Sequence, residues 1–306
     1  FFNYLCNRLK KFHIPDYSWA LAATLFWGLS FIWSSQLLKY YQPVTIIFIR
    51  LIISSGLLFI FIYSLGLHQK IARSDVKLIL LSALFNPFFY FLGENYGLKY
   101  STPTIAAVII ATIPVFSPLV AYLSFREKLT PVNFIGIAVS FIGVILILIN
   151  NDFGLTADVR GVIFLFFAVI AALLYSVTLK KLTSRYSAVI VIAYQNVIGI
   201  FLFLPVFLIF EVNNFFTIPL NMEIITSFLL LAILASSVSF VCFAHSVKLL
   251  GITKTNIFSN LIPVFTAFFS FLLLNESFTM RKIAGIAIVI GGVYLSERSK
   301  KPKQER

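Results

Sequence analysis

PVFSPLVAYLSFREKLT at residues 114–130 returns as PVFTAFFSFLLLNESFT at residues 263–279, and this repetition sets the architecture expected for the chain. The offset of 149 residues (114 to 263) holds without a gap from residues 98–146 to residues 247–295. The matched pairs include polar and conformationally special residues: Pro114/Pro263, Glu127/Glu276, Thr130/Thr279, Gly136/Gly285 and Gly143/Gly292. Apolar helices resemble one another by composition, but they rarely pair Pro, Glu and Gly at one fixed offset. The sequence therefore predicts an internal repeat.

The composition around the repeat is that of a membrane protein. Of the 306 residues 60% are hydrophobic and only 11% are charged, whereas soluble domains are about half apolar and a quarter charged. Apolar runs of about 20 residues recur, and that length crosses ~30 Å of hydrocarbon. Each run should be helical, because a helix satisfies its own backbone groups. The ten predicted spans are 17–37, 44–64, 76–97, 104–124, 132–149, 160–180, 188–209, 223–247, 254–274 and 280–296.

The basic residues predict the orientation of these spans. With a cytoplasmic N-terminus, 18 of the 24 Lys and Arg residues lie in cytoplasmic segments and 5 in outside loops, and Arg50 lies within a span. Cytoplasmic loops of membrane proteins are enriched in Lys and Arg, so both termini are predicted to be cytoplasmic. This topology also explains the net charge of +13. Because the charge is spread over short loops and the tail, we expect no nucleic-acid partner.

Each repeat holds five spans, an odd number, so the second copy enters the membrane from the opposite side. The predicted fold is an all-α membrane protein with ten transmembrane helices, arranged as two inverted five-helix repeats around a central cavity. Inverted repeats of this kind occur in many secondary transporters. The predicted organisation runs in five parts: a cytoplasmic segment 1–16, a first repeat 17–149, an extracytoplasmic linker 150–159, a second repeat 160–296 and a basic cytoplasmic tail 297–306.

The sequence lacks the usual signatures of catalysis and nucleotide binding. It has two cysteines, Cys6 and Cys242, and no CxxC, HExxH, GxxxxGK[ST] or GxSxG pattern. We therefore predict no catalytic residue, cofactor or metal site. Without an ATP-binding motif, any transport should be facilitated diffusion or ion-coupled.

The repeated stretches resemble those of the drug/metabolite transporter superfamily, in its EamA-type ten-helix branch. The resemblance covers nearly the whole chain. It includes the two 17-residue stretches, the glycines that follow them and the segment Trp27-Gly28-Leu29-Ser30. It implies a basket of helices around a central cavity, with export in many bacterial members and hence a place in the bacterial cytoplasmic membrane. The family carries amino acids, nucleobases, sugars and drugs, so the resemblance does not identify the substrate.

Two charged residues within spans are candidates for the site. Glu94 should face a cavity or a partner, since a charge at mid-helix costs roughly 2.5–3.5 kcal/mol on insertion scales. Asn86, Tyr90 and Glu94 follow at i, i+4 and i+8 and predict one polar stripe. The alternative places Glu94 near the membrane surface, pairing with Lys99. Arg50 suits capture of a carboxylate or phosphate, unless it snorkels to the interface.

Further candidates are uncharged or titrate near neutrality. Asn256 and Asn260 share a face of the ninth span with Pro263, and they either line the cavity or bond helix to helix. Trp27 is on a face of the first span that could line the cavity. His245 could relay protons with Glu94, but an imidazole near a helix end is more often merely hydrated.

These features favour a secondary transporter, an exporter of small organic metabolites such as amino acids or related compounds. It would work by alternating access, with a small-molecule substrate, the lipid bilayer and protons as its partners. Two alternatives are a membrane-embedded enzyme, which needs clustered catalytic groups, and a non-transporting receptor or scaffold, which normally needs long loops or a soluble extension.

Overall fold

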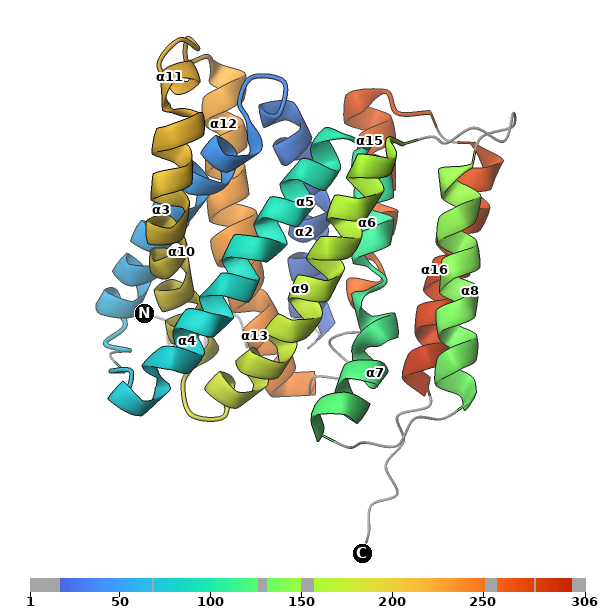
Figure 1. Cartoon of the computed structure of the whole chain (residues 1–306), viewed down its shortest axis with the longest axis horizontal. Coiled ribbons are helices and arrows are strands. Elements are labelled where there is room, and N and C mark those ends of the chain that lie inside the picture. Colours follow the sequence, from blue (N-terminus) through green and yellow to red (C-terminus); the bar gives the residue numbers. More distant parts are fainter. Residues whose placement is uncertain are drawn as a thin grey trace, which may run out of the picture.

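The computed structural model describes residues 17–67, 69–125, 131–149, 157–250, 258–277 and 279–298. Within these residues the chain forms helices and no strand, and the helices stand roughly side by side (Figure 1). The helices before the linker are α2 (Tyr17–Leu37), α3 (Pro43–Ser64), η1 (Arg73–Asp75), α4 (Val76–Ala83), η2 (Leu84–Phe89), α5 (Tyr90–Lys99), α6 (Pro103–Ile110), α7 (Ile113–Phe125) and α8 (Pro131–Leu148). Those after it are α9 (Val159–Thr183), α10 (Ala188–Phe210), α11 (Val212–Phe215), α12 (Met222–Leu230), η3 (Leu231–Val238), α13 (Ser239–Leu250), α15 (Ile262–Leu274) and α16 (Met280–Arg298).

The chain is an integral membrane protein. Among the residues that the structure describes, six helical stretches are long and apolar enough to cross a membrane: Tyr17–Leu37, Pro43–Ser64, Arg73–Lys99, Val159–Thr183, Ala188–Phe210 and Met222–Phe243. Three shorter apolar helices accompany them: Pro103–Phe116, Phe134–Leu148 and Ile262–Leu274. Large apolar side chains such as Phe201 and Ile209 lie on the outside of the bundle, 68% and 71% exposed. Such a surface suits contact with lipid and not with water.

The helix starts follow from the local sequence. Pro43 and Pro103 open α3 and α6, where a missing N–H costs nothing. The side chains of Asp158 and Asn221 cap α9 and α12, accepting the backbone N–H of Arg160 and Ile224, both at 2.8 Å. These polar caps mark where the chain leaves the apolar core.

Two of the predicted spans contain π-helical segments at matching places. Shifted by the repeat offset of 149 residues, η2 falls on residues 233–238, inside η3. Within η2, Asn86 has extended backbone angles, φ −146° and ψ 118°, and precedes Pro87. The prediction that Asn86, Tyr90 and Glu94 lie on one face of a regular helix is therefore wrong, because the helical hydrogen-bond ladder is interrupted at Asn86. Tyr90 and Glu94 do keep their i, i+4 relation within α5.

A second pair of irregularities lies in the fourth and ninth predicted spans. The fourth span is divided, because α6 ends at Ile110 and α7 begins at Ile113. The same offset carries residues 111–112 to residues 260–261, directly before α15 begins at Ile262. Each break lies just before a proline of the repeated stretch, Pro114 or Pro263, whose missing N–H disfavours a continuous helix.

α8 and α16 contact each other through glycines. A Cβ on Gly143 would lie 2.8 Å from the backbone oxygen of Gly285, and one on Gly292 would lie 2.8 Å from that of Gly136. The repeat offset of 149 residues converts one contact into the other. Gly143 of α8 corresponds to Gly292 of α16, and Gly136 of α8 corresponds to Gly285 of α16. Between them, Ser140 Oγ donates to the backbone oxygen of Val289 at 3.3 Å. The missing side chains of these glycines therefore allow α8 and α16 to pack closely.

α3 and α10 form a second antiparallel contact. The N-terminal part of α3 packs against the C-terminal part of α10, where Phe48 and Phe207 stack at 4.9 Å between ring centroids. Farther along, Asn196 of α10 reaches Ser54 of α3. The upper end of the bundle in Figure 1 carries the loops predicted to face outward, including residues 38–42 and 211–221, and the lower end carries the opposite loops.

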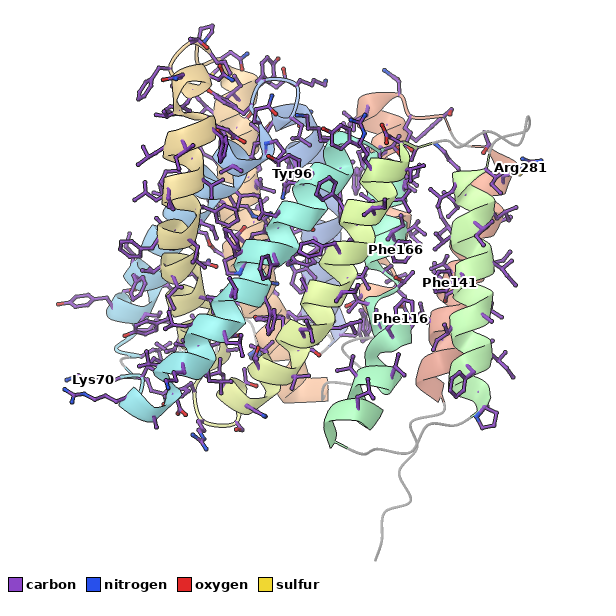
Figure 2. The ribbon with its side chains drawn as sticks, in the orientation of Figure 1. Lys70, Tyr96, Phe116, Phe141, Phe166 and Arg281 are labelled. Carbon is purple, nitrogen blue, oxygen red and sulfur yellow. The ribbon has the colours of Figure 1, made fainter. Side chains whose placement is uncertain are left out.

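Aromatic side chains join the α8–α16 pair to the other helices. The ring of Phe141 on α8 stacks on Phe166 of α9 at 5.8 Å and meets Phe116 of α7 edge-on at 5.7 Å. Figure 2 shows these three residues where α8 faces α7 and α9, whereas Lys70 and Arg281 lie at the lower and upper ends. The polar groups described next lie on the other side of α9, among α3, α5, α10 and η3.

Candidate functional site

Arg50 lies inside the bundle, on α3, with 4% of its surface exposed. Its Nε donates to Ser236 Oγ at 2.6 Å, and its guanidinium carbon lies 4.3 Å from the ring centroid of Phe91. Its Nη1 lies 3.9 Å from Glu94 Oε2. A snorkelling arginine would point its head to water, so the structure favours the buried alternative for Arg50.

Glu94 supplies the opposite charge from α5. It is 9% exposed, and its Oε1 accepts a hydrogen bond from the Tyr90 hydroxyl at 2.9 Å. The alternative partner considered for it, Lys99, instead donates to Gln42 Oε1 at 2.6 Å. At 3.9 Å the contact between Arg50 and Glu94 is an ion pair without a hydrogen bond. The two charges thus offset each other but leave hydrogen-bonding capacity on both.

Serine side chains of η3 extend the polar centre toward α10. Ser236 Oγ, besides accepting from Arg50, donates to the backbone oxygen of Leu231 five residues earlier at 3.1 Å. Ser237 Oγ lies 3.3 Å from Ser54 Oγ, which also accepts from Asn196 Nδ2 at 3.2 Å. The widened π-helical turn therefore places two hydroxyls where helices from both halves of the chain meet.

An amide with fixed orientation forms the next part of this centre. Gln195 Nε2 donates to Ser82 Oγ at 2.6 Å, and its Oε1 accepts from the Tyr175 hydroxyl at 3.1 Å. Thr178 Oγ1 also contacts Ser82 Oγ, at 3.0 Å. Both ends of the Gln195 amide are thus engaged, which holds Tyr175 and Ser82 in place.

A narrow cavity opens among these groups, with room for little more than a single water molecule. Its lining comes from α3, η2, α5, α9, α10, η3 and α13. The lining residues are Leu51, Asn86, Phe91, Tyr175, Ile192, Gln195, Asn196, Ser236 and Phe240. Arg50 lies directly behind this wall, since it holds Ser236 and covers Phe91.

The other predicted site residues take different places. Trp27 lies one layer outside the cavity: its Nε1 donates to the backbone oxygen of Ala235 at 3.1 Å and its ring meets that of Phe240. Asn260 is 5% exposed, has no partner for its Oδ1 within the described residues and is not part of the lining. His245 meets Trp19 edge-on at 4.8 Å, away from Glu94's contacts. Asn256 lies outside the described residues.

Carboxylates join the two halves at the upper end. Glu211, at the end of α10, accepts from the backbone N–H and the hydroxyl of Thr45 at 2.6 and 2.7 Å, where α3 begins. Glu276, just after α15, accepts from the hydroxyls of Thr102 and Thr104 at the start of α6, at 2.7 and 2.9 Å. Lys282 Nζ donates to Glu276 at 2.9 Å. A carboxylate at a helix N-terminus is also favoured by the helix dipole.

A tyrosine–carboxylate contact occurs at each end of the bundle. At the lower end the Tyr186 hydroxyl donates to Asp75 Oδ2 at 2.8 Å, and Arg185 pairs with the same carboxylate at 2.7 Å. At the upper end the Tyr40 hydroxyl donates to Glu223 Oε2 at 2.8 Å, and this bond raises the pKa of the Tyr40 phenol. Each tyrosine lies just before the second long helix of its half, so the two contacts are equivalent in kind.

Sequence reasoning missed most of the cavity wall. The residues selected from the sequence do not include Ser236, Asn196, Tyr175 or Gln195. One available signal was the position of Gln195, which is the eighth residue of α10 as Arg50 is of α3. The free-energy cost of a charge inside an apolar span singles out Arg50 and Glu94 from the sequence alone. A neutral amide in an apolar run cannot be distinguished in this way from a residue that only packs against its neighbours.

Fold and site together define a helical membrane protein with a buried polar centre, and comparisons with known proteins give its family. The model of the EamA-like transporter family matches residues 15–149 and again residues 159–298. An uncharacterized transporter of Archaeoglobus fulgidus is 24% identical over 284 residues, covering 92% of this chain and 98% of that protein. The uncharacterized transporter YetK of Bacillus subtilis is 25% identical over 259 residues, covering 83% and 78%.

The likeness extends to a solved structure. A crystal structure superposes with a TM-score of 0.67 at 16% identity and covers 94% of this chain and 99% of its own. At that identity the likeness concerns the fold alone. The chain belongs to the EamA-like transporter family, which confirms the resemblance to the drug/metabolite transporter superfamily predicted from its repeats.

Proposed function

We propose that the protein is a secondary transporter that exports small organic metabolites, such as amino acids or related compounds, by alternating access. Its ten spans would form two inverted five-helix repeats around the cavity between α3, α5, α10 and η3. The observation that carries this function is the buried pair of Arg50 and Glu94, joined through Ser236 to the second half of the chain. An intramembrane ion pair is costly, and where it occurs it commonly marks a substrate or ion pathway.

The repeat architecture has support from paired features. The π-helical segments, the breaks before Pro114 and Pro263, and the reciprocal glycine contacts all recur at the offset of 149 residues. Counterpart helices, α8 with α16 and α3 with α10, pack antiparallel, as expected if one half is inverted relative to the other. Two halves of similar structure can give inward and outward states of similar energy.

The membrane and the orientation belong to the same proposal. The bacterial relative and the EamA family favour the bacterial cytoplasmic membrane. The 18-to-5 distribution of basic residues favours cytoplasmic termini. The upper end of the bundle, with Glu211, Glu223 and Glu276, would then face outward, and the lower end with Asp75 would face the cytoplasm.

The test is solute flux in proteoliposomes, with and without a pH gradient, across a panel of amino acids and nucleobases. Glu94→Gln keeps the shape of the side chain and removes its charge. We expect it to abolish transport driven by the pH gradient. If solute exchange persists in Glu94→Gln, Glu94 couples protons; if exchange is lost as well, Glu94 binds substrate.

Asp158→Asn is the matched control, because it makes the same chemical change on an exposed side chain that pairs with Arg160. It should leave flux unchanged. Transport that is unaffected in both Glu94→Gln and Arg50→Ala would contradict the assignment of the site, and the absence of flux for every solute would contradict transport itself.

A further inference from the structure

The cavity wall carries no formal charge. None of its nine lining residues is Asp, Glu, Lys or Arg. Arg50 is held behind the wall by its bond to Ser236 and its contact with Phe91, and Glu94 neutralises it. A ligand with a net charge would bring an uncompensated charge into this centre, which is costly in a low-dielectric site. The wall therefore favours a ligand without net charge.

Two amides of the wall have unused hydrogen-bonding groups. Asn196 donates through Nδ2 to Ser54, but its Oδ1 makes no hydrogen bond to the described part of the chain. The side chain of Asn86 makes none at all with those residues, and it lines the cavity from the interrupted turn of η2. Gln195, by contrast, is engaged at both ends. The free groups are thus one complete carboxamide and one carboxamide oxygen.

Aromatic rings complete the lining. Phe91, Tyr175 and Phe240 approach the cavity from α5, α9 and α13. Rings of this kind stack on flat ligands or meet them edge-on. A carboxamide such as that of Asn86 can make two parallel hydrogen bonds to a ring edge on which a donor lies beside an acceptor, as asparagine does with adenine.

We propose that the cavity binds an uncharged, planar heterocycle of the nucleobase type, with Asn86 and Asn196 reading the hydrogen-bonding edge of the ring. Asn86 would donate one hydrogen bond to the ring and accept one from it, and Asn196 Oδ1 would accept a hydrogen bond from a further N–H of the ring. Phe91, Tyr175 and Phe240 would contact the ring faces. This substrate class rests on the transport function proposed above and narrows it, since a zwitterionic amino acid would instead engage Arg50 and Glu94. Entry of the ring requires the cavity to widen from its present size.

The test compares two ligand sets on the purified full-length protein in lipid nanodiscs and in proteoliposomes. The probes are radiolabelled adenine, hypoxanthine and uracil, set against leucine, phenylalanine and glutamine. We expect saturable binding and counterflow of the heterocycles. Asn86→Asp, which replaces the amide donor by a charge at constant shape, and Asn196→Leu, which removes the acceptor oxygen at similar size, should each weaken heterocycle binding about tenfold or more. Asn213→Asp is the control, because Asn213 is exposed at the upper end; it should bind like the parent protein.

A second pair of variants guards against misfolding. Asn86→Ser and Asn196→Ser shorten the side chain without adding charge, and they should show the same loss while eluting as folded protein. Heterocycle binding that is unchanged in all four variants would overturn the assignment to these amides. Counterflow of amino acids without heterocycles, lost in Arg50→Ala, would overturn the substrate class while leaving transport in place. The absence of counterflow for both sets would overturn transport as well.

Discussion

Arg50 and Glu94 stabilise each other inside the bundle, where both side chains are buried. Arg50 has two further contacts, to Ser236 and Phe91, and Glu94 has one, to Tyr90. Losing one partner leaves the other charge buried without compensation, and this commonly costs about 3–5 kcal/mol. Losing both leaves no uncompensated charge.

Losing one charged partner should therefore cost more free energy than losing both, and this can be measured. Arg50→Met should lower the unfolding free energy in detergent by about 3 kcal/mol or more, and Arg50→Met combined with Glu94→Gln should be clearly more stable than Arg50→Met alone. Arg160→Met breaks an exposed pair with Asp158 and should cost less than about 1 kcal/mol. The double-mutant cycle is measured by denaturant unfolding. Strictly additive effects would mean that Arg50 and Glu94 are not energetically coupled.

At the scale of elements, α8 and α16 approach so closely because glycines line their contact. Gly292 faces Ser140 and the backbone of Gly136, with no room for a Cβ. Its neighbour Gly291 has no atom within 4 Å of the corresponding position. The two adjacent glycines thus separate the packing effect of a methyl group from its effect on helix propensity.

We expect Gly292→Ala to destabilise the protein by about 1–3 kcal/mol, because the added methyl group must push the helices apart. Gly291→Ala should be neutral or stabilising by up to about 1 kcal/mol, since alanine favours the helix over glycine. Thermal unfolding in one detergent compares the two variants directly. Equal effects of the two substitutions would contradict the close approach of α8 and α16.

At the scale of the whole molecule, a tyrosine–carboxylate contact joins the halves at each end of the bundle. The lower end joins Asp75 to Tyr186 and Arg185, and the upper end joins Glu223 to Tyr40. If the halves rock against each other, each contact opposes opening at its own end. Weakening one contact should shift the population toward the state open at that end.

Tyr40→Phe and Tyr186→Phe remove one hydroxyl each and should therefore act in opposite directions. The reporter is a single cysteine at Ile192, which lines the cavity, in a chain whose Cys6 and Cys242 are replaced by serine. An impermeant maleimide added outside cells should label the reporter faster in Tyr40→Phe and more slowly in Tyr186→Phe. Changes of the same sign would argue against alternate opening at the two ends.

The orientation has its own expected outcome. Tags at positions 3, 184 and 303 should report the cytoplasm and a tag at position 215 the outside, because basic residues favour the cytoplasmic side. Protease protection of the tags in right-side-out and inverted vesicles measures this. Tags at 3 and 303 on opposite sides would show that the number of spans is not even.

The sequence predicted the site residues whose burial costs free energy however the helices pack. A charge within an apolar run is expensive wherever the helix packs, so Arg50 and Glu94 could be selected without knowing their neighbours, and Tyr90 followed from its i, i+4 relation to Glu94. The helical class of the fold and the family followed in the same way, from hydropathy and the repeated stretches. The division into residues 17–149 and 160–296 and the role of the site residues stay predictions.

The tertiary structure alone decided which residues share the cavity. Gln195, Asn196 and Ser236 are neutral and lie more than 100 residues along the chain from Asn86 and Arg50, so no sequence spacing links them. The π-helical turns also rotate Asn86 and Ser236 away from the faces that a regular helix assigns, and hydrophobic periodicity carries no sign of such an insertion. Local burial cost can be read along the chain, but hydrogen bonds between distant helices exist only once those helices have packed.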